Sequence, residues 1–143
     1  MVQVVLPNDA NPLGFILGGT VMHLIDIAGA ITAARHTRSQ VVTAAVDGLQ
    51  FLHPIKVGDL IILKAHITCV FTTSLEVEVD VFSEETLTGT RQLTSHAFLT
   101  FVALGKDGAH LQVPELIVET DADRRVCEEA RLRRAERLRN RQT

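Results

Sequence analysis

One helix-forming segment limits the folds open to this chain more than any other feature. Residues 20–34, TVMHLIDIAGAITAA, carry apolar side chains around nearly the whole circumference of a helix. A helix that is apolar on all sides is buried on all sides, so the rest of the chain is expected to wrap around it. The segment is shorter than the roughly 20 residues that a membrane-spanning helix needs, and it carries His23 and Asp26. We therefore expect a helix at the centre of a globular fold and no membrane span.

After this helix the hydrophobic pattern changes to an alternation with a period of two, which predicts strands. Strands are expected at residues 2–6, 41–52, 60–71, 75–81 and 93–104. In the third of these, one face is expected to carry Ile61, Leu63, Ala65, Ile67, Cys69 and Phe71. Successive strands joined by short turns favour an antiparallel sheet. The pattern predicts an α+β fold in which one long, curved antiparallel sheet wraps around the central helix.

The composition changes sharply at Asp121. The last segment is rich in arginine, interleaved with glutamate, and Glu129 and Arg133 stand at a spacing that supports a helix. We therefore divide the chain into one domain, residues 1–120, and a helical tail, residues 121–143. Two interpretations of the tail stay open: a solvated, partly frayed helix, or a helix whose arginines contact ligand phosphates.

Composition and charge exclude several classes of protein. Apolar residues make up 46% and charged residues 22% of the chain, as in ordinary globular proteins. The formal charge of −3 gives no nucleic-acid signature, and the N-terminus does not resemble a secretory signal. Cys69 and Cys127 are accordingly expected to be two reduced thiols in a cytoplasmic protein. No metal site is expected, because metal-ligand spacing is missing among the histidines His36, His53, His66, His96 and His110.

The loop before the central helix indicates chemistry. It ends in Gly18 and Gly19, where the helix begins and its free backbone N–H groups point outward. Those N–H groups can stabilise a developing negative charge on a substrate that approaches the bare backbone closely; loop flexibility is the alternative explanation. Asp26 lies two turns further on, in apolar surroundings where a carboxylate is unfavourable unless it is paired or used. Together these features indicate a small enzyme acting on acyl groups.

Six motifs follow one another between about residues 5 and 114: PNDANPLGFILGG, HLIDIAGAI with AARH, VVTAAVDGLQFLHPIKVGD, TSLEVEV, TGTRQLTSHAFLTFVAL and a final VP. In this order they resemble the hot-dog-fold acyl-CoA thioesterases, in the branch of bacterial and cytosolic acyl-CoA hydrolases. The hot-dog fold agrees with the helix and sheet expected above. The resemblance also implies a homodimer whose two sheets join edge to edge, with active sites at the interface, and further assembly, often into a hexamer (a trimer of dimers).

The resemblance makes Asp26 the catalytic carboxylate, a general base that activates water; direct attack through a mixed anhydride is the less favoured variant. Without the resemblance, a carboxylate tied to His23 or to a backbone group is the favoured explanation of Asp26. Asn11 matches a loop asparagine that faces the partner subunit's aspartate, although asparagine is also an ordinary turn former. Gly18 and Gly19 precede Asp26 by two helical turns, about 11 Å, so a thioester at the helix start is expected to meet the partner subunit's Asp26.

Four hydroxyl residues are weaker candidates for contacts to the pantetheine and nucleotide of coenzyme A: Thr43, Thr72, Thr73 and Ser74. The chain departs from many relatives at two places. Phe71 and Thr72 replace a Gly-Arg pair, and Leu17 replaces a histidine before the paired glycines. A phosphate-binding arginine is therefore missing there, and the substitutes are Arg35, Arg38, Arg91 or the tail.

The activity implied by the resemblance is hydrolysis of a fatty or other acyl-CoA to the free acid and coenzyme A. No cofactor is expected, since coenzyme A is part of the substrate and product. Phe15, Phe51 and Leu52 are the candidates for shaping the acyl site. The alternative from another class is a regulatory hot-dog protein that binds acyl-CoA without hydrolysing it. A hydratase or dehydratase ranks last, because His23 is its one candidate for a catalytic histidine near the helix.

Overall fold

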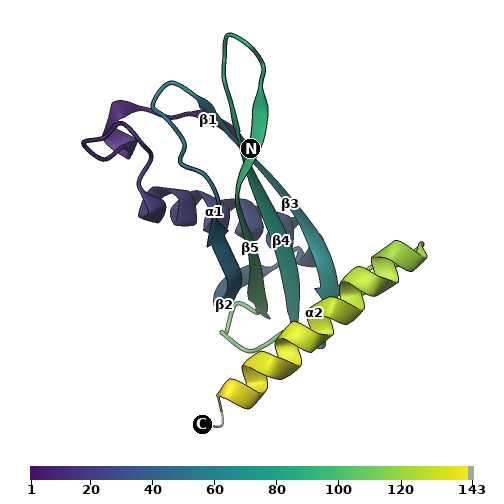
Figure 1. Cartoon of the computed structure of the whole chain (residues 1–143). Coiled ribbons are helices and arrows are strands. Elements are labelled where there is room, and N and C mark those ends of the chain that lie inside the picture. Colours follow the sequence, from purple (N-terminus) through teal and green to yellow (C-terminus); the bar gives the residue numbers. More distant parts are fainter. Residues whose placement is uncertain (142–143) are drawn as a thin grey trace.

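The computed structural model describes residues 1–141 of the chain. Along the sequence its elements are β1 (Val2–Val4), η1 (Pro7–Asp9), α1 (Gly18–Thr37), β2 (Gln40–Phe51), β3 (Leu60–Val70), β4 (Ser74–Glu84), β5 (Arg91–Leu104) and α2 (Asp121–Asn140). The strands form one antiparallel sheet in the order β1-β3-β4-β5-β2. Figure 1 shows α1 and α2 on opposite faces of this sheet. The predicted α+β architecture of one antiparallel sheet around a central helix is confirmed.

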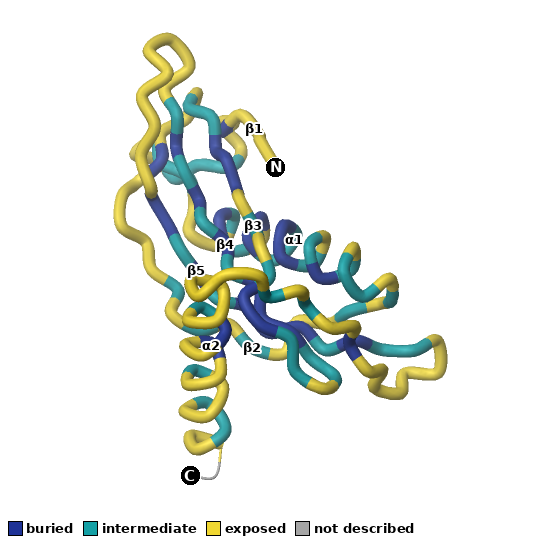
Figure 2. Tube along the Cα trace, turned by 90° about the vertical axis from the view of Figure 1, so that its right-hand side faces the viewer, coloured by how far each residue is buried: buried dark blue, intermediate teal, exposed yellow. Residues whose placement is uncertain are grey.

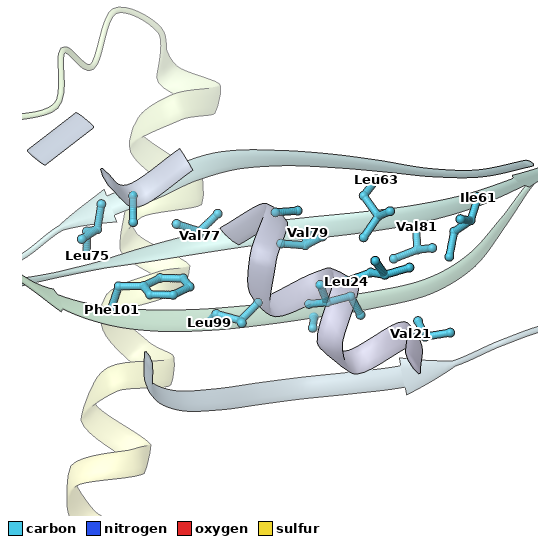
Figure 3. Packing of buried hydrophobic residues seen from close by; sticks show 14 of the residues in the cluster. Val21, Leu24, Ile61, Leu63, Leu75, Val77, Val79, Val81, Leu99 and Phe101 are labelled. Carbon is cyan, nitrogen blue, oxygen red and sulfur yellow. The ribbon is translucent and has the colours of Figure 1, made fainter. Parts of the chain in front are cut away.

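The main core lies between α1 and the inner face of the sheet. Strand β4 lies at the centre of the sheet and supplies every second residue to this core: Leu75, Val77, Val79 and Val81, all 0% exposed. Helix α1 packs on them with residues at helical spacing, Val21, Leu24, Ile25 and Ala28 (Figure 3). Each fully buried side chain of this size contributes about 1.5–3 kcal/mol by leaving water, so this layer holds α1 firmly in place.

Gly29 marks the point of closest approach between α1 and the sheet. A Cβ atom at this position would lie 3.0 Å from two ring carbons of Phe101, which is itself 0% exposed. We expect Gly29→Val to lower the free energy of unfolding by about 1–3 kcal/mol, because the packed core cannot move aside. Urea denaturation measures the difference. Gly19→Ala is the matched control, since its added methyl group meets no atom within 4 Å, and an equal loss in both variants would contradict the packing argument.

Strand β3 departs from the predicted alternation near its end. Its register against β4 shifts between Ile67 and Cys69, as in a β-bulge. The predicted shared face therefore ends at Ile67: Cys69 packs outside the main core, with Cys127 and Ala130 of α2, and Phe71 lies against that same group. The expectation of two reduced thiols is also wrong in the structure, because Cys69 and Cys127 are joined by a disulfide.

Helix α2 crosses the outer face of the sheet (Figure 1). It begins with Thr120 as N-cap, whose hydroxyl accepts a hydrogen bond from the Asp123 N–H. Ion pairs then fasten it to two strands: Arg133 to Glu76 of β4, and Arg137 to Asp47 of β2, the second at 2.6 Å. The prediction of a helix here is confirmed. Most of its side chains are exposed, as the solvated interpretation foresaw, but α2 is fastened to the sheet through Cys127, Arg133 and Arg137 and is not free in solvent.

Helix α1 is not buried on all sides within one chain, contrary to expectation. Ile31 is 50% exposed, and Figure 2 shows α1 alternating between buried and exposed turns. Strand β2, at the edge of the sheet, also exposes apolar side chains at Val42 and Val46, 47% and 39% exposed. Apolar side chains are therefore exposed both on α1 and along the β2 edge of the sheet. Within residues 1–141, no helix is long and apolar enough to cross a membrane.

Candidate functional site

The first turn of α1 presents two unpaired backbone donors. The N-cap residue is Leu17, which has no side-chain oxygen to cap the helix, and its carbonyl accepts from the N–H groups of Thr20 and Val21. In the part of the chain that the structure describes, the N–H groups of Gly18 and Gly19 have no hydrogen-bond partner. Both glycines are exposed. The start of α1 is thus an accessible pair of N–H groups at the positive end of a helix dipole.

Asp26 lies two turns further along α1 and is half-buried. Its Oδ1 accepts a hydrogen bond of 2.6 Å from the hydroxyl of Thr43 in β2. The pairing of β2 with β5 is irregular between Thr43 and Ala45, next to this contact. Such irregularities re-aim side chains and are frequent beside active sites. Thr43 therefore orients Asp26, and among the hydrogen bonds of residues 1–141 none joins the Asp26 carboxylate to His23 or to a backbone group.

Asn11 occupies a tight turn in the loop between η1 and α1. Its side-chain oxygen accepts from the N–H groups of Leu13 and Phe15, at 3.0 and 3.2 Å. Its backbone N–H donates to the Phe15 carbonyl at 2.8 Å. The turn-forming role foreseen for asparagine is thus present. These bonds use the side-chain oxygen, and within residues 1–141 no hydrogen bond from the amide NH₂ is found, so this group is available as a donor.

Within one chain these groups do not meet. Gly18 and Asp26 are eight residues apart in one helix, a separation of about 12 Å along its axis. No hydrogen bond joins Asn11 to Asp26 among the contacts of residues 1–141. A single carbonyl carbon cannot touch both ends of a 12 Å span, so a site that uses all three elements needs two copies of the chain.

The three candidates Thr72, Thr73 and Ser74 lie together at the turn from β3 to β4. Their backbone is occupied: the Thr72 carbonyl accepts from Val113 and the Thr73 carbonyl from Ala103. Across the sheet, Leu75 pairs with Phe101, which pairs with Thr43. Two strand spacings, about 10 Å, therefore separate Thr43 from this turn. The sheet brings the four candidates to one end but not into contact.

Cavities lie at both ends of α1. One of about 290 Å³ lies at the start of α1 and is lined by Ile16, Gly18, Val21, Phe51, Leu52, His53, Pro54, Ile55 and Ser95. Phe51 and Leu52 line it as foreseen for an acyl site, whereas Ile16 and Ser95 carried no sequence signal. Phe15 is not among the lining residues. The cavity is mainly apolar and opens beside the unpaired N–H groups of Gly18 and Gly19.

The second cavity, of about 650 Å³, lies where α1 ends and β2 begins. Two cations line it, Arg38 and Lys106, together with Ser39 and Gln40. Arg38 adopts the left-handed conformation, φ 53°, that ends α1 and turns the chain into β2. Lys106 was missed by sequence reasoning, because it belongs to a turn 68 positions further along the chain that the fold brings here.

Three of the other arginines proposed for a phosphate are paired with carboxylates. Arg91 pairs with Glu84 at 3.0 Å, and Arg124 of α2 pairs with Asp121 at 3.0 Å. Burial lowers the pKa of the Arg133 guanidinium, but its hydrogen bonds and charge interaction with Glu76 raise it by more, so the pKa stands above its ordinary value. Arg133 is thus a structural cation. Arg38 and Lys106 share one cavity, and Arg131 and Arg134 of α2 share another, of about 390 Å³, with Thr72.

Comparison with known proteins finds thioesterases and acyl-CoA thioester hydrolases. The model of the thioesterase superfamily matches residues 13–90. The chain is 42% identical over 119 residues to a Bacillus subtilis protein named as an uncharacterized acyl-CoA thioester hydrolase, covering 83% of this chain and 69% of that protein. It is 34% identical over 133 residues to the human cytosolic acyl coenzyme A thioester hydrolase, covering 92% of this chain. The chain spans only 35% of the length of that human protein.

Solved structures that resemble this chain are also acyl-CoA thioesterases and hydrolases. An apo-hexameric acyl-CoA thioesterase superposes with a TM-score of 0.92 at 40% identity, covering 98% of this chain and 90% of that one. An acyl-CoA hydrolase from Staphylococcus aureus, solved in complex with butyryl coenzyme A, coenzyme A and coenzyme A disulfide, superposes with a TM-score of 0.87 at 35% identity. That match covers 99% of this chain and 89% of the other. The similarity therefore extends over almost the whole chain, α2 included.

Proposed function

This chain belongs to the thioesterase superfamily, and on that basis we propose that it hydrolyses acyl-CoA thioesters to a free acid and coenzyme A. The observation that carries the proposal is the pair of features on α1: an Asp26 carboxylate oriented by Thr43, and two unpaired N–H groups at Gly18 and Gly19. Thioester hydrolysis needs an activated water and a stabilised oxyanion. These two features supply one each.

Asp26 is assigned as the general base. Its carboxylate accepts a proton from water while the water oxygen attacks the thioester carbonyl carbon. The N–H groups of Gly18 and Gly19 hold the resulting oxyanion, assisted by the dipole of α1. Collapse breaks the carbon–sulfur bond and releases coenzyme A as a thiolate, which needs little acid assistance because the pKa of an ordinary thiol is about 8.5. Attack by Asp26 itself, through a mixed anhydride, is the less favoured variant. The reaction assigned to these groups uses no cofactor and no metal.

The site is assigned to a dimer interface. Strand β2 leaves one edge of the sheet unpaired and exposes Val42 and Val46 there, a surface that pairing with a second β2 would cover. In such a dimer the glycine N–H groups and Asn11 of one subunit meet the partner subunit's Asp26. The amide NH₂ of Asn11 then orients the water or donates to the carbonyl oxygen. Hexameric relatives support further assembly into a trimer of dimers.

Two cavities accommodate the two ends of the substrate. The apolar cavity beside Gly18, lined by Phe51 and Leu52, is assigned to the acyl group. The cavity with Arg38 and Lys106 is assigned to phosphate groups of coenzyme A, in place of the arginine missing at Phe71 and Thr72. Hydroxyls of Thr72, Thr73 and Ser74 are assigned to the pantetheine and nucleotide. A cytoplasmic location is proposed as well, supported by the name of the human relative, a cytosolic acyl coenzyme A thioester hydrolase.

Thiol release from a panel of acyl-CoAs tests the function. We expect turnover on at least one member, with the longest accepted chain set by the cavity of about 290 Å³ beside Gly18. Chain lengths from acetyl to palmitoyl and an aromatic acyl group cover the range. Saturable binding of coenzyme A with no thiol release from any member would favour the regulatory binding protein over the enzyme.

A further inference from the structure

A second group of polar side chains gathers on the outer face of the sheet, away from α1. It comprises His66 of β3, Glu78 and Asp80 of β4, and His96 of β5. The strand register places His66 opposite Glu78 and Asp80 opposite His96. In β4 the neighbouring residues Val77, Val79 and Val81 face the core, so alternation turns Glu78 and Asp80 outward. The sequence spacing of these histidines indicated no metal site, but three adjacent strands bring both to the same carboxylate.

The distances within this outer-face cluster are those of a coordination shell. His96 Nε2 lies 3.0 Å from Glu78 Oε1 and 3.7 Å from Asp80 Oδ1, and His66 Nε2 lies 3.3 Å from Glu78 Oε2. One ligand atom each from Glu78, Asp80 and His96 all fall within 4.8 Å of one another. Ligands held at about 2.0–2.2 Å around one tetrahedral ion lie roughly 3.4 Å apart, so little movement is needed to enclose a cation.

Within residues 1–141, no lysine or arginine forms an ion pair with Glu78 or Asp80. Lys64 stands opposite Asp80 in the register, but its ammonium lies over the Phe82 ring. The guanidinium of Arg133 is committed to Glu76. Burial raises the pKa of the Asp80 carboxyl above its ordinary value, and the charge of Glu78 raises it further, with His96 and His66 opposing. Two half-buried carboxylates thus lie beside two imidazoles, and the charge of Arg133 also acts on Glu78.

We propose that His66, Glu78, Asp80 and His96 bind one transition-metal dication, of which Zn²⁺ is the test case. Mixed imidazole and carboxylate ligands favour Zn²⁺ and its neighbours over Mg²⁺ or Ca²⁺, which prefer oxygen alone. Because the ligands come from β3, β4 and β5, the ion ties three strands together on the face opposite Asp26. Its role is structural and separate from thioester hydrolysis.

The test is titration of tag-free, chelator-stripped protein with ZnCl₂ in a calorimeter. We expect one Zn²⁺ per chain and a thermal unfolding midpoint that rises with Zn²⁺ concentration. Loss of a residue that only hydrogen-bonds to a metal ligand typically weakens metal binding by roughly 10- to 100-fold. Glu78→Gln and His96→Gln each remove a ligand itself, so each is expected to weaken Zn²⁺ binding by more than that. Co²⁺ provides a second readout, because ligation by this site gives a visible absorption band that both variants lose.

His110→Gln is the matched control, an exposed histidine outside the cluster that is expected to leave Zn²⁺ affinity unchanged. Circular dichroism of the metal-free variants verifies that each is folded, since both substituted side chains are only half-buried. The proposal is overturned if wild-type protein shows no saturable uptake of Zn²⁺ or Co²⁺. It is also overturned if folded Glu78→Gln and His96→Gln both bind Zn²⁺ as tightly as wild type.

Discussion

Asp26→Asn is expected to lower kcat for acyl-CoA hydrolysis by about 10²- to 10⁴-fold, the range that a positioned general base contributes. The amide keeps the shape of the side chain and still accepts the hydrogen bond from Thr43, so the fold and assembly are expected to remain. What it cannot do is take a proton from water. The measurement is thiol release under saturating substrate, with size-exclusion chromatography of the same samples.

Two control variants sharpen this result. Asp123→Asn makes the same chemical change at an exposed position of α2 and is expected to keep wild-type turnover. Thr43→Val removes the hydroxyl that orients Asp26, and a smaller loss is expected, since the base remains but is less well held. Turnover of Asp26→Asn within a factor of about three of wild type would remove Asp26 from the mechanism.

Mixed dimers test whether the site spans two chains. Neither Asp26→Asn nor Asn11→Ala is expected to be active alone. In a hybrid of the two, one site contains the intact Asn11 of the first subunit and the partner subunit's intact Asp26, while the other site has lost both. After unfolding and refolding an equal mixture, a two-fold symmetric dimer is expected to recover about a quarter of the wild-type sites. No recovery in a mixture that forms dimers would assign each site to one chain.

Arg133→Met is expected to lower the free energy of unfolding by about 3–5 kcal/mol, the usual loss when one partner of a buried ion pair is removed. Glu76 is 1% exposed and accepts from Arg133 Nε and Nη2, at 3.0 and 2.7 Å. The Thr68 hydroxyl also donates to it, at 2.6 Å, but carries no charge. The guanidinium further lies 3.6 Å over the Phe98 ring. Without Arg133, the Glu76 carboxylate remains buried without a counter-charge.

Urea denaturation of three variants separates charge from packing. Arg131→Met is the matched control, an exposed arginine of the same helix, and is expected to change the free energy of unfolding by less than about 0.5 kcal/mol. Combining Arg133→Met with Glu76→Gln removes the unpaired charge and is expected to recover part of the loss. A loss below about 1 kcal/mol in Arg133→Met alone would show that the pair is not the bond that fastens α2.

The central helix and the strands could be predicted because their signals are local. The apolar run at residues 20–34 indicates a buried helix. The alternation of Leu75, Val77, Val79 and Val81 indicates a strand with one buried face. The docking of α2 could not be predicted in this way. It depends on Glu76, one of three alternating acidic residues in β4, being covered by an arginine 57 positions later. The shift at Ile67, which moves Cys69 to the outer face, likewise leaves no local pattern.

In the candidate site, too, local sequence signals could be predicted and contacts between distant residues could not. Asp26 stood out because a carboxylate in an apolar helix requires an explanation, and its neighbour Thr43 was named only through the family resemblance. The cation pair Arg38 and Lys106, and the cluster around Glu78, arise from strand register and turn placement. His66 and His96 are 30 positions apart in the sequence, a spacing that carries no meaning until β3 and β5 are known to flank β4.

The disulfide between Cys69 and Cys127 has a mechanical consequence. Tension applied through α2 passes from Cys127 straight into Cys69 of β3 and bypasses the intervening chain, a sequence separation of 58. The chain segment that contains β4 and β5 lies within that covalent loop and therefore cannot be pulled out between the two ends while the bond is intact. When the molecule is stretched from its two ends, its contour length is shorter by that loop, and reduction of the bond would release the loop as one additional extension.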